Sequence, residues 1–256
     1  MRLLLPLSLC ALSLSAQVPE AKWSFDVHTL PATLEGTFNG TVDGNAINLD
    51  LKQGLGLEKD KTKPGGALEY QGHRFGFALA MDAQDYKGSA IVNQAVVIDG
   101  TSYQSGTQIT SQVKLKSYDL NWTIRALTWE QAWVGVDLGF HGWDLDMSAT
   151  GTEQTTLQTK TSAKKISVPI PQLGLSVGGK AFGDRFVSRA SFHILKYKGA
   201  TYHRWQGDVR YFPLAWLGVR AFIEDEAFDV PKGSVKDDLI FNLKRSGTGF
   251  GVVLRF

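Results

Sequence analysis

The last eight residues of the chain, "GFGVVLRF" (249–256), alternate between apolar and other positions. One face of this segment carries four large apolar side chains, which are Phe250, Val252, Leu254 and Phe256. A repeat of two residues is typical of a β-strand, whose successive side chains point to opposite faces. A terminal segment with one fully apolar face is unusual for a soluble domain, so we expect this strand to lie against an apolar environment.

The same alternation recurs along most of the chain. Clear examples are "RFGFALAMD" (74–82), "SYDLNWTIRA" (117–126), "AWVGVDLGFHG" (132–142), "HRWQGDVRYF" (203–212) and "LGVRAFIE" (217–224). The pattern predicts ten strands, near residues 32–41, 65–72, 73–88, 107–127, 130–148, 164–181, 185–198, 200–212, 215–229 and 237–256. Asp99-Gly100 is a typical two-residue hairpin turn, and Pro169 and Pro171 predict a bulge or register switch.

An even number of alternating strands, joined by short turns at one end and longer loops at the other, is typical of a transmembrane β-barrel. The fold class that we predict is therefore all-β, a single antiparallel barrel of about ten strands (8–12). A soluble β-sandwich also alternates. Charges in the middle of the strands and the lack of a linker in 240 residues favour the barrel.

The N-terminus predicts export. Arg2 precedes the short apolar run 3–14, and small residues follow, so residues 1–16 are expected to be a signal peptide and 17–256 the barrel domain. Cys10 is the only cysteine, so the exported chain would contain no disulfide. A formal net charge of +2 gives no strong field that would attract nucleic acid.

The end of the chain resembles the C-terminal assembly signal of Gram-negative outer-membrane proteins at Phe250, Gly251, Val252, Leu254 and Phe256. The stretches "DVRYFPLAWLGVRAFIEDEAFDV" (208–230) and "LDLKQGLGLEKD" (49–60) resemble small outer-membrane barrels of the OmpA/OmpW-like group. This resemblance implies an outer-membrane location and short periplasmic turns. It also implies contact with outer-membrane lipids and lipopolysaccharide, and assembly by the barrel-assembly machinery through the last strand. It carries no activity residue by residue.

Charged side chains occupy the polar faces of the predicted strands. The predicted inward set contains seven acids and seven bases: Glu35, Glu69, Asp82, Asp119, Asp137, Asp208 and Glu224 with Arg74, Arg125, Lys180, Arg189, Arg204, Arg210 and Arg220. A ten-stranded barrel is only slightly wider than one that side chains fill. Unpaired buried charges are costly, so we expect an ion-pair network and a largely closed lumen.

Aromatic residues predict two interfacial girdles. One would hold Trp129, Trp133, Tyr211, Phe212, Trp216 and Phe256, and the other Tyr86, Trp143, Tyr197, Tyr202 and Trp205. Acids that include Glu226, Asp144 and Asp146 would line a solvated rim at the loop end.

No catalytic motif stands out. No histidine is followed two residues later by serine, as in outer-membrane lipid A deacylases, and no metal-ligand spacing is present. We therefore predict a monomeric, non-enzymatic barrel without cofactor, metal or nucleic acid, with a structural or surface-binding role. Two alternatives remain open, a narrow channel for small solutes and an enzyme that modifies lipid or protein at the outer leaflet.

Overall fold

The computed structural model describes residues 22–42, 45–57, 61–91, 96–103, 105–152, 156–233 and 240–256. The predicted signal peptide, residues 1–16, lies outside these ranges. In the part of the chain that is described, no α-helix has the length and apolar character needed to cross a membrane.

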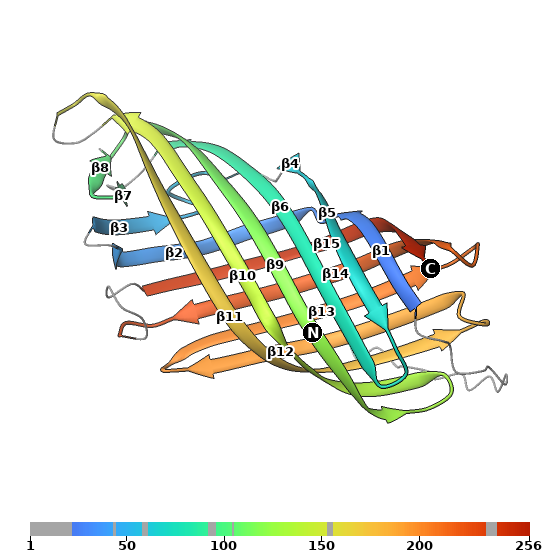
Figure 1. The fold of residues 1–256 in the computed structure, drawn as a ribbon. Coiled ribbons are helices and arrows are strands. Elements are labelled where there is room, and N and C mark those ends of the chain that lie inside the picture. Colours follow the sequence, from blue (N-terminus) through green and yellow to red (C-terminus); the bar gives the residue numbers. More distant parts are fainter. Residues whose placement is uncertain are drawn as a thin grey trace, which may run out of the picture.

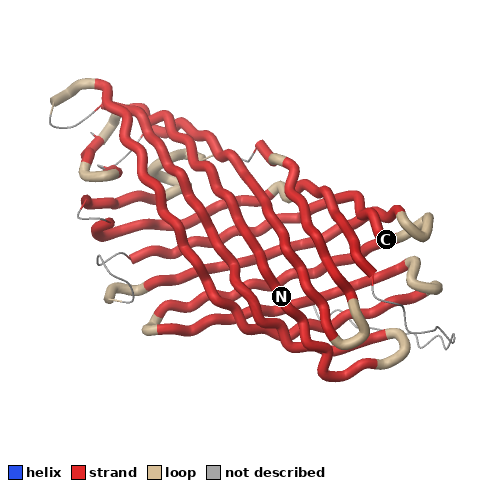
Figure 2. Tube along the Cα trace, viewed as in Figure 1, coloured by secondary structure: helices blue, strands red, loops and turns tan. Residues whose placement is uncertain are grey.

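Ten antiparallel strands form a closed ring, as the alternation predicted (Figure 1, Figure 2). In ring order they are β1 (Lys22–Thr29), β5 (Pro64–Gln71), β6 (Phe75–Ile91), β9 (Gln108–Thr128), β10 (Ala132–Thr152), β11 (Thr159–Ala181), β12 (Phe186–Tyr197), β13 (Ala200–Tyr211), β14 (Leu217–Val230) and β15 (Ile240–Arg255). Pairing of β1 with β15 closes the ring, which leaves the barrel wall without an open edge near the termini.

Five further strands lie outside the ring order: β2 (Ala32–Val42), β3 (Asn45–Asp50), β4 (Lys61–Thr62), β7 (Val96–Ile98) and β8 (Thr101–Tyr103). The sequence pattern assigned the first ring strand to 32–41, and this is wrong. Segment 22–29 is the ring member, and β2 continues it along the other half of β15. β2 then pairs with β3, while β5 pairs with β1.

We call the end with the short connections 72–74, 129–131, 182–185 and 212–216 the turn end, and the opposite end the loop end. Toward the loop end the ring divides into two sheets, because β11 pairs with β12 only from Leu173 onward and β2 pairs with β15 and β3 but not with β5. Figure 1 shows β6, β9, β10 and β11 running obliquely past the more nearly horizontal β13, β14, β15 and β2. The two sheets enclose an apolar core between them.

The loop-end core contains large side chains from both sheets. Its members include Leu34, Phe38, Leu49, Leu51, Leu55, Tyr86, Val96, Ile98, Tyr103, Ile109, Val113, Leu115, Trp143, Leu145, Met147, Ile166, Ile170, Tyr202, Phe228, Val230, Phe241 and Leu243. The β7–β8 hairpin adds Val96, Ile98 and Tyr103 to this core. Its turn, Asp99-Gly100, has positive φ at both residues, so the predicted hairpin is confirmed.

The polarity of the inner and outer faces reverses along the longer strands, although the in–out alternation itself continues, and β10 shows this most clearly. Nearer the turn end, Leu138 and Phe140 point outward and are 45% and 57% exposed. Beyond Gly142, Trp143 and Leu145 are buried inside, and Asp144 points outward. One part of β10 is therefore apolar outside and polar inside, and the other part has the arrangement of a water-soluble sandwich.

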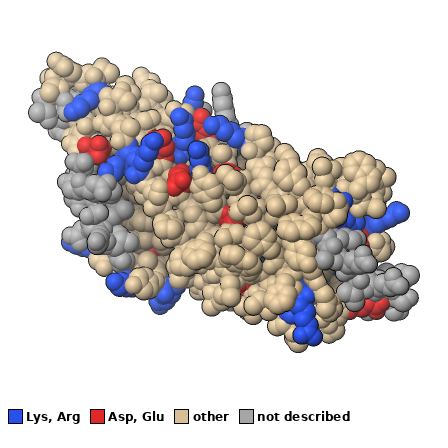
Figure 3. All heavy atoms as spheres, viewed as in Figure 1, with Lys and Arg blue, Asp and Glu red and all other residues tan. Residues whose placement is uncertain are grey.

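The outward apolar side chains form a belt around the ring. It includes Phe25, Val27, Leu79, Met81, Trp122, Ile124, Leu138, Phe140, Leu173, Leu175, Phe192, Ile194, Trp205, Val209, Val219, Ile223, Phe250, Val252 and Leu254, all at least 41% exposed. On the face drawn in Figure 3, a broad area with few charged side chains separates the charges near the two ends. Such a belt is the surface that a bilayer covers in a transmembrane barrel.

The bulge predicted at Pro169 and Pro171 is absent. β11 passes through both prolines in unbroken register with β10, pairing Pro169 with Gly142 and Pro171 with Phe140. Both residues lie before Leu173, where β11 has no β12 partner, so the missing N–H groups leave no ladder bond unmade on that side. The register shift on this sheet lies instead at Val134–Gly135, between β9 and β10.

Candidate functional site

Ionisable side chains fill the lumen below the loop-end core. Eight carboxylates lie there: Asp26, Glu69, Asp82, Asp119, Asp137, Asp208, Glu224 and Glu226. Five arginines contact them at ion-pair distance: Arg189, Arg204, Arg210, Arg220 and Arg245. Alternation places them inside because the belt residues on the same strands point outward.

Five of these residues and His141 form a closed ring of alternating acid and base, which we call the six-residue ring: Asp119, Arg204, Glu224, Arg245, Glu226 and His141. Arg204 bonds Asp119 and donates to Glu224 Oε2 at 2.6 Å. Arg245 bonds Glu224, and its Nε lies 2.5 Å from Glu226 Oε1. His141 closes the ring, with Nδ1 3.2 Å from Asp119 and Nε2 3.2 Å from Glu226.

Two buried side chains on the loop-end side hold the six-residue ring from above. Trp143 Nε1 donates to Glu226 Oε1 at 3.2 Å, and the Tyr202 hydroxyl donates to Glu226 Oε2 at 3.3 Å. Both residues also belong to the loop-end core. The ring is therefore fixed directly against an apolar plug that continues to the loop end.

A second chain of charges lies closer to the turn end. Arg210 binds Glu69 with two donors, at 2.5 and 2.9 Å, and its Nε donates to Asp208 at 2.8 Å. Arg220 bonds Asp208 and donates to Asp26 at 3.0 Å. His28 bonds Asp26 through Nδ1, and its Nε2 lies 2.9 Å from Asp82. We call this series, from Glu69 to Asp82, the lower chain.

Asp137 anchors a third group on the wall formed by β9, β10, β11 and β12. It accepts from Thr123 at 2.5 Å and from Ser176 at 2.9 Å, and Arg189 lies 3.3 Å away. His193 Nε2 also lies 3.3 Å from Asp137. A buried carboxylate with this many donors is well compensated for its lost hydration.

His28 and His141 each place both ring nitrogens against carboxylate oxygens. An ionised carboxylate can only accept. Both nitrogens of His28 are hydrogen-bonded, so both donate and this imidazole carries a positive charge, whereas His141 is hydrogen-bonded through Nδ1 and its Nε2 only lies near Glu226. With the imidazolium of His28, six cations contact the eight carboxylates, and His141 lies beside two of these acids. Most of the charge in the lumen is therefore compensated, as a poorly hydrated interior requires.

Three small cavities lie between the turn end and the middle of the lumen. A cavity of about 50 Å³ lies between the lower chain and the six-residue ring, among His28, Asp82, Arg204 and Arg220. A second, of about 20 Å³, lies among Glu69, Arg189 and Arg210, and a third of about 110 Å³ opens at the turn end. Each has room for one or a few waters. They do not continue past Tyr202 and Trp143, which are fully buried.

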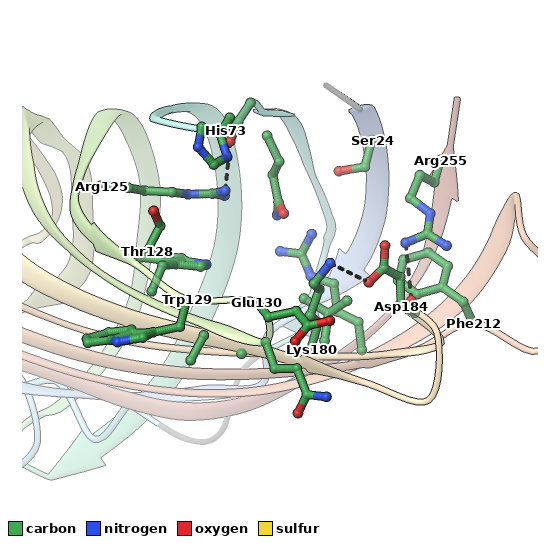
Figure 4. A pocket seen from close by; sticks show the side chains of 18 residues that line it. Ser24, His73, Arg125, Thr128, Trp129, Glu130, Lys180, Asp184, Phe212 and Arg255 are labelled. Atoms are coloured by element: carbon green, nitrogen blue, oxygen red, sulfur yellow. Dashed lines mark hydrogen bonds and ion pairs between the residues drawn. The ribbon is translucent and has the colours of Figure 1, made fainter. Parts of the chain in front are cut away.

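The turn-end cavity has charged and aromatic walls (Figure 4). Arg125 lies over the Trp133 ring at 4.7 Å from its centroid, and Arg255 lies over Phe212 at 4.0 Å. Lys180 Nζ pairs with Asp184 at 3.1 Å between them. Gly178 makes room for the indole, because a Cβ there would lie 2.4 Å from Trp133.

The structure changes several positions in the predicted lumen set. Glu35 points outward on β2 and bonds Lys52 at 2.7 Å, which lowers the pKa of its carboxyl. The prediction failed because β2 lies beyond the reversal, where inward positions such as Leu34 are apolar. Arg74 is exposed in the turn after β5. Arg125 does face the lumen, but it donates to the Gly72 carbonyl at 2.7 Å instead of joining an ion pair.

The predicted aromatic girdles are also partly wrong. Tyr86, Trp143 and Tyr202 are buried in the loop-end core, and only Tyr197 and Trp205 of that set are exposed. At the turn end, Trp133 lies inside the barrel under Arg125 and Phe212 is covered by Arg255. The other members of that set, Trp129, Tyr211, Trp216 and Phe256, are at least 49% exposed.

Four residues of the network were missed. Asp26 and His28 lie on β1, whose alternation in "KWSFDVHT" (22–29) is readable but falls outside the predicted strands. Glu226, expected on a solvated rim, is completely buried in the six-residue ring. Arg245 was not assigned a face. Within the described residues, no group of three or more His, Cys, Asp or Glu is arranged to hold a metal ion.

The predicted assembly signal lies in the last part of β15, which pairs with β1, and its apolar side chains point outward. Phe250, Val252 and Leu254 are 60%, 50% and 41% exposed, and Phe256 is 73% exposed. The terminal backbone is fixed by mutual bonds between Trp23 and Phe256, each 2.9 Å long.

Comparison of the structure with solved structures identifies its architecture. The outer-membrane protease OmpT of Escherichia coli superimposes with a TM-score of 0.61 at 11% identity, over 95% of this chain and 99% of OmpT. The chain has the fold of the outer-membrane β-barrels. The NalP translocator domain of Neisseria meningitidis (TM-score 0.40, 8% identity, 93% and 89% of the chains) and Ail of Yersinia pestis (0.34, 12%, 93% and 100%) are more distant. No family model matches the sequence, and no curated protein is similar to it.

Proposed function

We propose that the protein is a monomeric outer-membrane barrel with a closed lumen, which anchors a folded head outside the outer leaflet. The observation that carries this proposal is the contact between the six-residue ring and the loop-end core. Trp143 and Tyr202 belong to both, so a paired charge layer and an apolar plug block the same passage.

The change in polarity along β10 supports both the orientation of the barrel in the membrane and a folded head beyond the outer leaflet. The belt would contact membrane lipid and lipopolysaccharide, and the segments beyond Gly142 on β10 would stand in water above it. The turn end would face the periplasm, and β15 would present its apolar face to the barrel-assembly machinery. The head would then serve a structural or surface-binding role.

The proposal assigns no enzymatic activity and no cofactor. OmpT is described as a protease, but the likeness is one of fold at 11% identity. The luminal acids and histidines here hold one another in ion pairs beneath the core. A peptide above the head would have to cross the loop-end core to reach them.

A liposome-swelling assay tests the closed lumen. Purified protein reconstituted into liposomes should give no faster entry of arabinose than empty liposomes, while a general porin in the same lipid gives rapid swelling. Swelling that rises with the amount of folded protein would contradict the proposal and favour the solute-channel alternative.

Incubation with a casein digest should leave the peptides intact, and specific cleavage would favour the enzyme alternative.

A further inference from the structure

The turn-end cavity contains two arginines, Arg125 and Arg255, that form no ion pair with a carboxylate of the described residues. Arg125 donates to the Gly72 carbonyl, and its Nε is buried without a hydrogen-bond partner. Arg255 donates to the carbonyls of Ala215 and Asp184, at 3.2 and 3.3 Å. Among the residues that the structure describes, neither guanidinium has an acid at ion-pair distance, whereas the five arginines deeper in the lumen all do.

Each of the two guanidinium groups stacks with one planar face on an aromatic ring. Trp133 lies under Arg125 and Phe212 under Arg255, so the aromatic rings cover the planar faces. A cation–π contact uses no N–H donor. Some N–H donors on the edges of the guanidinium groups therefore still lack a partner among the described residues. Two such N–H groups on one edge match the paired oxygens of a carboxylate or phosphate.

The remaining charges around the cavity do not cancel this excess. Lys180 and Asp184 neutralise each other at 3.1 Å, and Arg210 is bound by Glu69. Glu130, on the exposed rim, is the one other acid among the described residues that line the cavity. The cavity, about 110 Å³ in volume, thus keeps a positive interior with room for a small anion in place of several waters.

We propose that the turn-end cavity binds a small oxyanion, a carboxylate or phosphate group, on the free edge of Arg125, with Arg255 contributing the second positive charge. The site lies apart from the closed middle of the lumen, so it would operate on the periplasmic side of a barrel that conducts nothing. Figure 4 shows Arg125 and Arg255 extending toward the cavity from opposite walls.

Isothermal titration calorimetry on the full-length folded protein in a neutral detergent tests this site, with acetate, benzoate and inorganic phosphate as separate probes. At least one probe should bind saturably at one site per chain. Arg125→Gln should weaken that binding by about tenfold or more, because a charge-assisted paired contact is lost. The preferred probe distinguishes a carboxylate from a phosphate ligand.

Arg74→Gln is the matched control, because Arg74 is an exposed arginine at the same end that does not line the cavity. It should leave the affinity unchanged. Arg255→Gln should weaken binding less than Arg125→Gln, and it keeps the test valid if the Arg125 variant fails to fold. The proposal is overturned if no probe binds the wild type, if Arg74→Gln weakens binding as much as the cavity variants, or if a folded Arg255→Gln and every folded Arg125 variant bind normally.

Discussion

Arg204 on β13 lies directly opposite Glu226 in the ladder with β14, yet its guanidinium donates to the diagonal neighbour Glu224 at 2.6 Å. Glu226 is bound instead by Arg245, its direct partner across β15. This offset is what joins three neighbouring strands into one network. Glu224 contacts Arg204 and Arg245, and Glu226 contacts Arg245 and His141 of β10, so removal of one of these bases leaves a buried acid only half compensated.

Removal of Arg245 should therefore be strongly destabilising. Arg245→Ala is expected to lower the free energy of unfolding by about 3–5 kcal/mol, because Glu224 and Glu226 both lose a buried partner. Its neighbour Lys244 is exposed and lies 3.6 Å from exposed Asp225, so Lys244→Ala should change stability by at most about 1 kcal/mol. Urea unfolding of both variants in lipid vesicles measures the difference, and equal effects would mean that the lumen is hydrated at Arg245.

The reversal on β10 predicts where the bilayer ends. Phe140→Arg places a charge in the belt and should cost about 2–4 kcal/mol if Phe140 lies near the midplane and less near the edge. Asp144→Arg, also outward but beyond Gly142, should be nearly neutral because water already surrounds that position. Leu145→Arg, which points into the core, should again be severe. A neutral Phe140→Arg in vesicle unfolding would show that the belt is not in lipid.

Deletion of Phe256 should impair assembly. The outward face of β15 would lose its terminal aromatic side chain and the closing contact between Phe256 and Trp23. We expect the truncated chain to accumulate in the periplasm, while Phe256→Tyr, which keeps an aromatic ring, assembles normally. Fractionation of cells followed by a heat-modifiability gel gives the answer. Normal outer-membrane levels of the truncated chain would rule out a role for this residue as an assembly signal.

The strands could be predicted because a repeat of two is a local property of the sequence. The same alternation also contains the change in polarity of the inner face, which could have been read from the sequence. Trp143, Leu145 and Met147 continue the parity of Asp137 and His141, so inward positions change from polar to apolar within one strand. The prediction assumed that the inner face is polar along the whole length of every strand. This assumption wrongly placed Glu35 in the lumen and Trp143 in an aromatic girdle.

The pairing inside the lumen could not be predicted in the same way. Arg210 meets Glu69, 141 positions away, and Arg220 meets Asp26, 194 positions away. Which inward residues face each other across a barrel depends on the stagger and tilt of all its strands. No local pattern fixes these quantities, and the missed strand β1 removed Asp26 and His28 from the set beforehand.

Single-channel recording in a planar bilayer tests the closed lumen most directly. Wild-type protein should show no steady conductance, and Arg245→Ala should also be silent where it folds, because the loop-end core still covers the six-residue ring. Inserted protein must be verified in the same bilayers by its resistance to extraction. Stable openings of the verified wild type, independent of voltage, would contradict the closed lumen and show that ions pass the contact of Trp143 and Tyr202 with Glu226.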